Sequence, residues 1–262
     1  MKRILYILTL SILSLVGCNG SGEAVVFESL RIPETAKNAN DATCNIDIRI
    51  DYAKGGAAAD AINKAILQCG LFPKECVTDG KEKDFPKAAE GIANYYKNEF
   101  EASDAEYVKL ESDSIVYAPG ASAYYYVLGS EVSHPCDSII NYQIGYDSFM
   151  GGVRNTYQIA ALNFAAKTGR LIKLKDFIRP EAEGKITDMI VADVAKQYEC
   201  ASLQELQGNH LIFNEFDPYV PENFVIGRDS VEFIYNCEEV AHYAVGAIVV
   251  KFAYKDLTGC LR

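Results

Sequence analysis

The stretch SIINYQIGYD, residues 138–147, decides the fold class, because hydrophobic and polar side chains alternate along most of its length. Its hydrophobic positions are Ile140, Tyr142, Ile144 and Tyr146. An alternation with a period of two is typical of a β-strand that buries one face and leaves the other in water. The stretch CNIDIRIDY, residues 44–52, has the same pattern. We therefore predict a strand at each place.

Further strands are predicted on both sides of the first stretch. Residues 107–117, 121–132 and 156–164 are rich in Tyr, Val and Ile, and Gly and Pro residues separate them. The short connections favour an antiparallel meander. The chain also ends in predicted strands, at residues 223–226, 231–235 and 247–254.

Helical patterns occupy the segments between these strands. Residues 57–69 repeat hydrophobic side chains every three to four positions, and Asp84 begins a second helix. Pro180 opens a third helix, and Ser202-x-x-Glu205 is a capping box for a short one. This order predicts an α+β fold in which helices pack on one face of an antiparallel sheet or sheets, as one unit or as two tightly packed subdomains.

The N-terminus has the pattern of an export signal. Met1-Lys2-Arg3 precedes the uncharged run ILYILTLSILSLV at residues 4–16. A membrane-spanning helix needs about 20 residues, so the run fits the apolar part of a secretory signal. The signal ends in Leu15-Val16-Gly17-Cys18, which resembles the lipobox of bacterial lipoproteins. The resemblance implies a signal peptide at residues 1–17 and a Cys18 that carries diacylglycerol and palmitate.

The same resemblance places the protein at a membrane. Each buried CH₂ of an acyl chain contributes about 0.8 kcal/mol, so two or three chains anchor a protein stably. Residues 18–43 begin with the flexible Asn19-Gly20-Ser21-Gly22 and are expected to form a tether. Asn at position 19, where Asp is the alternative, favours the outer membrane of an envelope with two membranes and leaves the leaflet open. We expect a lipid-anchored protein of the cell envelope.

Export would place seven further cysteines where disulfides form. They are Cys44, Cys69, Cys76, Cys136, Cys200, Cys237 and Cys260. An odd number leaves at least one thiol free or paired between chains. Cys69 and Cys76 flank the turn Gly70-Leu71-Phe72-Pro73 and form the candidate disulfide, a bond that typically contributes about 2 to 4 kcal/mol.

Composition and charge exclude several classes of protein. The 262 residues are 49% hydrophobic and include 17 Tyr and 12 Phe, enough for a packed core and too many for a disordered chain. The net charge is −11, and loss of Lys2 and Arg3 with the signal lowers it to −13. Such a chain is a poor match for nucleic acid or for anionic lipid.

Two blocks of sequence resemble a known family. The first is NFAAKTGRLIKLKDFI at residues 163–178 with the Gly-Gly pair before it, and the second is VEFIYNCEEVAHYAVG at residues 231–246. The residues that agree include Gly151, Gly152, Asn163, Phe164, Thr168, Gly169, Asp176, Glu239, Tyr243 and Gly246. These blocks resemble the domain of unknown function in the extracellular part of the anti-sigma factor RsiV and in the N-terminal region of the deacetylase PdaC. Cys237, Glu238 and His242 depart from the pattern.

The resemblance covers residues 149–257. The change from helical to β patterns near residues 101–104 sets the expected boundary between an N-terminal α+β portion at residues 44–103 and a C-terminal RsiV-like portion at residues 104–262. RsiV recognises lysozyme through this region, which implies that the fold can serve as a receptor surface, whereas PdaC keeps its chemistry in another domain. The matching residues also have a structural interpretation, since Thr168-Gly169 suits a hairpin turn and Asp176 can cap the turn after it.

Motifs for catalysis and metal binding are missing from the sequence. It contains no Gly-x-Ser-x-Gly, no phosphate-binding glycine loop and no His-Glu-x-x-His. Cys-x-x-Cys is absent too, and His134, His210 and His242 are scattered, so Cys237 with His242 is the only candidate metal cluster. Glu238-Glu239 and Tyr124-Tyr125-Tyr126 are more often a solvated loop and a buried strand than an acid pair and a sugar platform. We expect no cofactor, no metal and no catalytic residue.

The sequence therefore favours a membrane-anchored, non-enzymatic binding or sensing lipoprotein of the bacterial cell envelope. Its expected partner is a lysozyme-like protein or peptidoglycan, because the acidic charge would attract a basic protein. Two alternatives stay open: an envelope hydrolase that acts on peptidoglycan or glycan, and a structural component of an envelope complex. The oligomeric state does not follow from the sequence.

Overall fold

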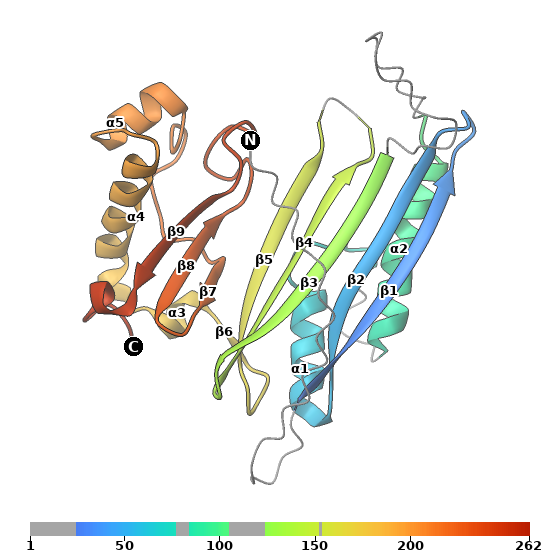
Figure 1. Cartoon of the computed structure of the whole chain (residues 1–262), viewed down its shortest axis with the longest axis horizontal. Helices are drawn as coiled ribbons and strands as arrows, with labels where there is room; N and C mark the ends of the chain where they lie inside the picture. The colour runs from blue at the N-terminus through green and yellow to red at the C-terminus, as the bar shows by residue number, and fades with distance from the viewer. Residues whose placement is uncertain (1–24, 77–83, 105–123, 152–153) are drawn as a thin grey trace.

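The computed structural model describes residues 25–76, 84–104, 124–151 and 154–262, which form two β-sheets and the helices packed on them (Figure 1). The first sheet has the strand order β1-β2-β3-β4-β5-β6. Its strands are β1 (Val26–Lys37), β2 (Thr43–Lys54), β3 (Tyr124–Cys136), β4 (Ile139–Phe149), β5 (Thr156–Ala165) and β6 (Leu171–Ile172). The predicted strand at residues 107–117, the lipobox with Cys18, and Gly152 lie outside the described residues.

The second sheet is smaller and antiparallel, with the order β7-β8-β9. Its strands are β7 (Phe224–Ile226), β8 (Ser230–Tyr235) and β9 (Ile248–Ala253). The helices of the described residues are α1 (Gly56–Leu67), α2 (Phe85–Glu101), α3 (Leu174–Phe177), α4 (Glu183–Gln197) and α5 (Leu203–Glu205). Short helical turns occupy Pro180–Ala182, Leu206–His210 and Tyr254–Leu257. The α+β class predicted from the sequence is confirmed.

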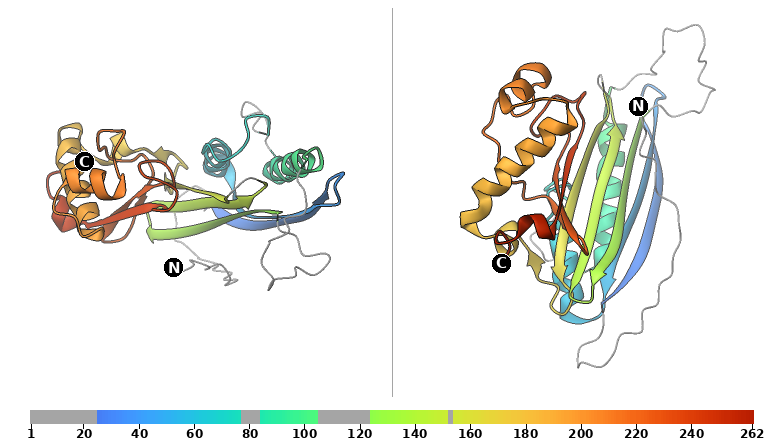
Figure 2. Two further views of the ribbon diagram at one scale, coloured as in Figure 1. Left: turned by 90° about the horizontal axis from the view of Figure 1, so that it is seen from above. Right: turned by 60° about the vertical axis from the view of Figure 1, so that its left-hand side comes forward.

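Helices α1 and α2 cover one face of the first sheet (Figure 2). The alternation in β2 explains this, because Ile46, Ile48 and Ile50 are each 1% exposed while the residues between them face the other way. Helix α2 begins as predicted, with the Asp84 side chain accepting a hydrogen bond from the backbone of Lys87. Helix α1 is fixed to β2 by Asn63, whose amide both donates to and accepts from the backbone of Ala53 at 2.8 Å.

The tyrosine cluster of β3 belongs mainly to this first core. Tyr124 and Tyr126 are buried on the helix-covered face, and the Tyr126 ring stacks on Tyr96 of α2 with 3.7 Å between ring centroids. Tyr125 points to the opposite face, as the period of a strand requires. The predicted packing role of this cluster therefore describes two of its three members.

A second core lies between α4 and the smaller sheet (Figure 1). One face of α4 is buried, with Ile186, Ile190 and Val194 all inaccessible to solvent. They pack in one cluster with Val231 and Phe233 of β8 and with strand β9. No helix in the described ranges is long and apolar enough to cross a membrane.

Three features of the fold correct the expected organisation. Strand β1 occupies residues that were expected to belong to the tether at 18–43, and it pairs with β2 along its whole length. Pro33 in its centre is compatible with a strand because β1 lies at the sheet edge, where proline is tolerated. Strands β2 and β3 are parallel, because the chain makes two helices between them. The expected boundary at 103/104 thus falls inside one sheet.

Asparagine side chains join the two sheets where a backbone ladder is missing. Asn163 of β5 donates from Nδ2 to the Phe224 carbonyl at 2.8 Å, and its Oδ1 accepts from the Ile226 amide at 2.9 Å. Asn141, its cross-strand neighbour, donates to the Ile226 carbonyl at 2.7 Å. Asn141 and Asn163 are 3% and 1% exposed, so these bonds satisfy polar groups that water cannot reach.

Asparagine side chains next to the strands of the second sheet form hydrogen bonds with the backbone of β5. The Asn223 amide accepts from the Ala161 backbone at 2.7 Å and donates to the Ile159 carbonyl at 3.0 Å. The Asn236 amide accepts from the Ile159 backbone at 2.8 Å and donates to the same carbonyl at 3.0 Å. We call Asn141, Asn163, Asn223 and Asn236 the asparagine seam. It fixes the end of β5 beside the loop that follows β8.

Candidate functional site

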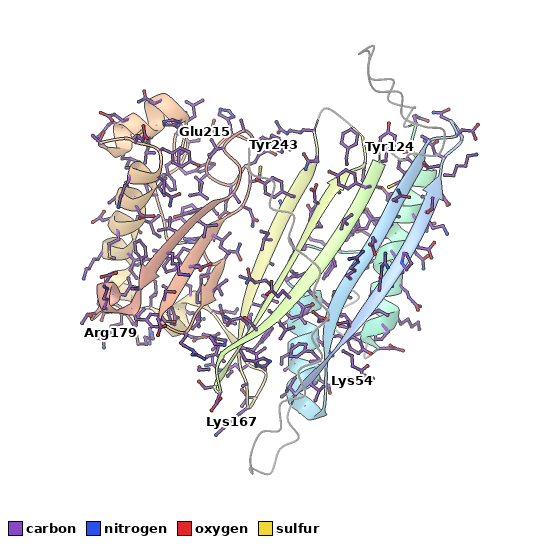
Figure 3. The ribbon with its side chains drawn as sticks, viewed as in Figure 1. Lys54, Tyr124, Lys167, Arg179, Glu215 and Tyr243 are labelled. Atoms are coloured by element: carbon purple, nitrogen blue, oxygen red, sulfur yellow. The ribbon has the colours of Figure 1, made fainter. Side chains whose placement is uncertain are left out.

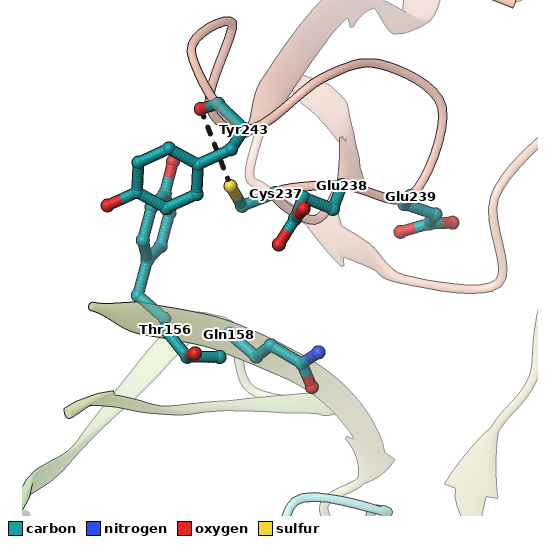
Figure 4. A pocket seen from close by; sticks show the side chains of 7 residues that line it. Thr156, Gln158, Cys237, Glu238, Glu239 and Tyr243 are labelled. Atoms are coloured by element: carbon teal, nitrogen blue, oxygen red, sulfur yellow. Dashed lines mark hydrogen bonds between the residues drawn. The ribbon is translucent and has the colours of Figure 1, made fainter. Parts of the chain in front are cut away.

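An open hollow of about 280 Å³ lies between the start of β5 and the loop that follows β8 (Figure 4). Thr156, Tyr157, Gln158, Cys237, Glu238, Glu239 and Tyr243 line it. Glu239 and Tyr243 are residues of the family pattern, and Cys237 and Glu238 are departures from it. The hollow therefore combines the family's loop with side chains particular to this chain.

The loop after β8 is held in shape by Glu239. Its Oε2 accepts from the Asn236 backbone at 2.7 Å, and its Oε1 accepts from the Tyr219 hydroxyl at 2.7 Å. Burial and the Glu239 carboxylate both raise the pKa of Tyr219. Both carboxylate oxygens of Glu239 are thus engaged within the protein.

Tyr157 fixes the other end of this loop. Its hydroxyl accepts a hydrogen bond from the Ala247 backbone at 2.9 Å. Gly246 has φ +82°, which favours glycine, and a β-carbon there would lie 2.8 Å from the Tyr157 hydroxyl, which would have to shift. Burial, followed by the neighbouring Cys237 side chain, raises the pKa of Tyr157 to about 12.

Tyr243 is oriented by a polar chain that reaches the first sheet. Its hydroxyl donates to Oδ1 of Asn155, and Nδ2 of Asn155 donates to Asp147 at 2.8 Å. The Tyr125 hydroxyl donates to the same Asp147 oxygen at 3.1 Å. Burial and the Asp147 charge raise the pKa of Tyr125 to about 12. Tyr243 and the start of β3, marked by Tyr124, lie at the same end of the molecule (Figure 3).

Arg154 contacts two of the residues that line the hollow, Tyr243 and Glu238. Its guanidinium carbon lies 4.7 Å from the centroid of the Tyr243 ring, and its NH2 group forms an ion pair with Oε1 of Glu238. Glu238 has φ +64°, a left-handed conformation that is uncommon for a residue with a side chain. The side chains of Arg154 and Glu238 are each 47% exposed.

The structure brings together only some of the residues that the sequence analysis selected. Glu239, Tyr243 and Gly246 meet at the hollow. The others of the set are structural and lie elsewhere: Gly151, Asn163, Phe164, Thr168, Gly169 and Asp176. Arg154, Asn155 and Asp147 were missed, because nothing in their local sequence distinguishes them from ordinary surface residues.

The first block of the family pattern builds the connection from β5 to α3. Phe164 is fully buried in the first core. Thr168 and Gly169 form the predicted turn, with Gly169 at φ +66°. Asp176 accepts from the backbone of Lys173 at 3.1 Å, so it caps the start of its own helix, where the sequence had suggested the turn that follows. Gly151 has φ +125° and open space around it.

The seven cysteines in the described parts of the chain are free thiols. The predicted Cys69–Cys76 disulfide is therefore not formed in the structure. Cys76 instead donates toward the Gly91 carbonyl of α2 at 3.9 Å, and burial raises the pKa of Cys69 to about 11. Among the residues with described positions, no three His, Cys, Asp or Glu side chains group as metal ligands. The Cys237 thiol faces the Tyr243 carbonyl at 3.7 Å.

The C-terminal region matches a known protein family. Residues 175–255 match a family described as protein of unknown function, DUF3298. A member of this family from Bacteroides fragilis NCTC 9343 has a similar structure, with 22% identity, a TM-score of 0.70 and coverage of 93% of this chain and 96% of that chain. A DUF3298 family protein from Pseudomonas aeruginosa PAO1 has 14% identity, a TM-score of 0.59, and coverage of 93% and 97%.

These similarities support fold and domain type. The predicted domain of unknown function is confirmed, although the matched range begins after the Asn163 to Gly169 block. At identities below 25%, the two solved structures show a shared fold alone. No curated protein matches the chain.

Proposed function

Starting from a chain that carries a DUF3298 domain behind a lipobox-like signal, we propose a lipid-anchored binding protein of the bacterial cell envelope. The domain has no enzymatic role in this proposal and recognises another protein, with a lysozyme-like protein as the first candidate. The observation that carries the proposal is the hollow, in which the family's loop and β5 present aromatic rings and carboxylates at an open surface.

The contacts in the hollow favour binding over turnover. Both carboxylate oxygens of Glu239 accept hydrogen bonds within the protein, from the Asn236 backbone and from the Tyr219 hydroxyl. A general acid or base needs a proton-accepting atom within reach of the substrate. A carboxylate engaged in this way is suited to hold the loop in shape. The acidic chain would then attract a basic partner over long range.

The anchor is tested by comparing the full chain with its Cys18→Ala variant in a bacterial host. We expect wild-type protein in the membrane fraction and labelled by a palmitate analogue, and the variant unlabelled. The physical reason is that acyl chains supply the membrane affinity. Equal labelling and equal membrane association of the two proteins would refute the anchor.

Binding is tested with the intact lipoprotein in detergent, immobilised lysozyme and purified peptidoglycan. Retention on lysozyme at low salt that weakens as salt rises supports the proposal, because the Debye length falls from about 30 Å at 0.01 M to about 8 Å at 0.15 M. Retention only on peptidoglycan would replace the protein partner by the cell wall. Release of soluble wall fragments over time would overturn the non-enzymatic role in favour of a hydrolase.

A further inference from the structure

Arg154 occupies the place that a foreign cation would take at the hollow. Its guanidinium lies over the face of the Tyr243 ring, at 4.7 Å from the centroid, and pairs at the same time with the Glu238 carboxylate. An aromatic face and a carboxylate converging on one cation are the two elements by which proteins recognise basic side chains. The arrangement is therefore a binding geometry that is filled by the chain itself.

One of the two recognition groups, the Tyr243 ring, is held in place independently of Arg154. The Tyr243 ring is fixed by its hydroxyl, which donates to Asn155, and the loop around it is fixed by Glu239 and Gly246. Glu238 projects from a left-handed backbone position at φ +64°. Groups that are oriented before a ligand arrives lose less entropy when the ligand binds.

The resident arginine is weakly held. Arg154 and Glu238 are each 47% exposed, and exposed ion pairs contribute about 0 to 1 kcal/mol. A cation over an exposed ring contributes about 0.5 to 1 kcal/mol. Arg154 can therefore exchange its contacts with Tyr243 and Glu238 for contacts with water at a small cost in free energy. The hollow that Tyr243 and Glu238 line has about 280 Å³ of space, and Thr156 and Gln158 line it as well.

We propose that this hollow recognises a single guanidinium or ammonium side chain of the protein ligand, with the Tyr243 ring and the Glu238 carboxylate as its contacts and Arg154 as an internal competitor. The inference rests on the proposed function, because it names the chemistry that the same hollow selects. Binding exchanges one cation for another, so the Arg154 side chain swings into solvent when the ligand's side chain enters.

The test measures binding of Nα-acetyl-arginine amide to the full-length protein by NMR titration. Arg154→Ala removes the internal competitor and should tighten binding about tenfold relative to wild type. The reason is that Arg154 no longer fills the site, so a larger fraction of the molecules can bind the probe. Arg31→Ala is the matched control: it removes the same charge from an arginine that pairs with Asp47 in the first sheet. The control should leave the affinity at the wild-type value.

Two further measurements make the outcome decisive. Adding Glu238→Gln to Arg154→Ala should abolish the gain, and the neutral isostere Nα-acetyl-citrulline amide should bind none of the variants. Unfolding midpoints establish that the variants are folded, which the exposure of both side chains favours. Equal affinity of wild type and Arg154→Ala, or equal binding of citrulline, overturns the inference.

The inference and the proposed function fail separately. If lysozyme is retained equally by wild type and by Glu238→Gln, the binding role stands and the cation pocket is wrong. If lysozyme is not retained but Arg154→Ala binds the arginine probe tightly, the pocket stands and the proposed partner is wrong.

Discussion

Single glycines and asparagines determine much of this structure. Gly169 was expected only to supply the positive φ of a turn, and it does so at φ +66°. The fold adds a second demand, since a β-carbon at this position would lie 2.1 Å from the Ala58 carbonyl oxygen at the start of α1. The turn thus touches a helix that is more than a hundred residues away in sequence. Only glycine satisfies both demands.

Substitution by alanine should distinguish a glycine that the structure requires from one that it does not. We expect Gly169→Ala to destabilise the protein by more than about 1 to 2 kcal/mol, the cost of the left-handed conformation alone. Gly184→Ala is the control, because Gly184 lies in α4 with open space around it and no positive φ. That change should stabilise by about 0.5 to 1 kcal/mol. Urea unfolding measures both, and an equal effect of the two substitutions would contradict the assigned contact.

At the scale of elements, the hairpin of β3 and β4 carries the one exposed thiol among the described cysteines. Cys136 ends β3, and its sulfur lies 3.2 Å from the Ser138 hydroxyl. Hydrogen bonds from the Ser138 side chain and from the hairpin backbone lower the pKa of Cys136. Burial acts in the opposite direction on Cys44, where it raises the pKa to about 12.

These differences predict an order of reactivity. In the reduced protein at neutral pH, iodoacetamide should modify Cys136 first and Cys44 last, because the thiolate is the nucleophile. Peptide mass spectrometry after brief labelling measures the order. Ser138→Ala should slow the modification of Cys136 and leave the other cysteines unchanged. Uniform labelling, or no effect of Ser138→Ala, would show that the hairpin does not favour the thiolate.

The pairing of β1 with β2 includes a charge cluster whose contribution depends on pH. Partial burial raises the pKa of Asp47, but hydrogen bonds from Arg31 at 2.9 Å and Arg49 at 2.7 Å outweigh it, so the pKa is lowered from 3.8. A carboxyl whose folded pKa is lowered stabilises the protein above its unfolded pKa, and this stabilisation is lost as the pH falls through the folded pKa.

Asp47→Asn should therefore lower the free energy of unfolding at pH 7 by about 0.5 to 1 kcal/mol, the range of partly exposed ion pairs. The difference from wild type should shrink as the pH falls below 3.8 and vanish once the pH passes below the lowered folded pKa, where Asp47 of the wild type is protonated. Urea unfolding at pH 7, 5 and 3 measures the difference. A difference that stays constant with pH would mean that the Asp47 charge does not stabilise β1.

At the scale of the whole molecule, the asparagine seam holds two sheets with separate cores together. Strand β6 pairs with only two residues of β5, so most of the outer edge of β5 has no strand partner there. The side chains of Asn223 and Asn236 form hydrogen bonds with backbone groups along this edge of β5. The side chains of Asn141 and Asn163 form hydrogen bonds with backbone groups of β7. Because asparagine is disfavoured inside strands, Asn141 and Asn163 were a usable signal for this seam.

Loss of the seam should affect global stability. Asn163→Ala leaves the Phe224 carbonyl and the Ile226 amide without their partner. We expect a loss of about 2 to 6 kcal/mol, since each of these two unsatisfied buried groups costs about 1 to 3 kcal/mol. Asn94→Ala on the exposed surface of α2 is the control and should change stability by less than about 0.5 kcal/mol. Urea unfolding compares them. Equal stability of both variants would rule out the seam as the link between the sheets.

The candidate site was only partly accessible to sequence analysis. The family pattern supplied Glu239, Tyr243 and Gly246, which the structure places at the hollow. Arg154 could not be connected with Tyr243, because a cation over a ring is defined by distance in space and the two residues are 89 positions apart. Asp147 and Asn155 could not be connected with Tyr243 from the sequence either, because their hydrogen bonds also depend on distance in space.

The sequence by itself determined the strands at residues 44–52 and 138–147, the helices after Asp84 and Pro180, and the turn at Gly169. Each depends on neighbours within a few residues: the alternation of a strand, the period of a helix or the φ of a turn. Only the tertiary structure decided that β2 and β3 run parallel, that β1 completes the sheet and that asparagines join the sheets. These depend on which distant segments meet, and the burial of two cores selects that pairing.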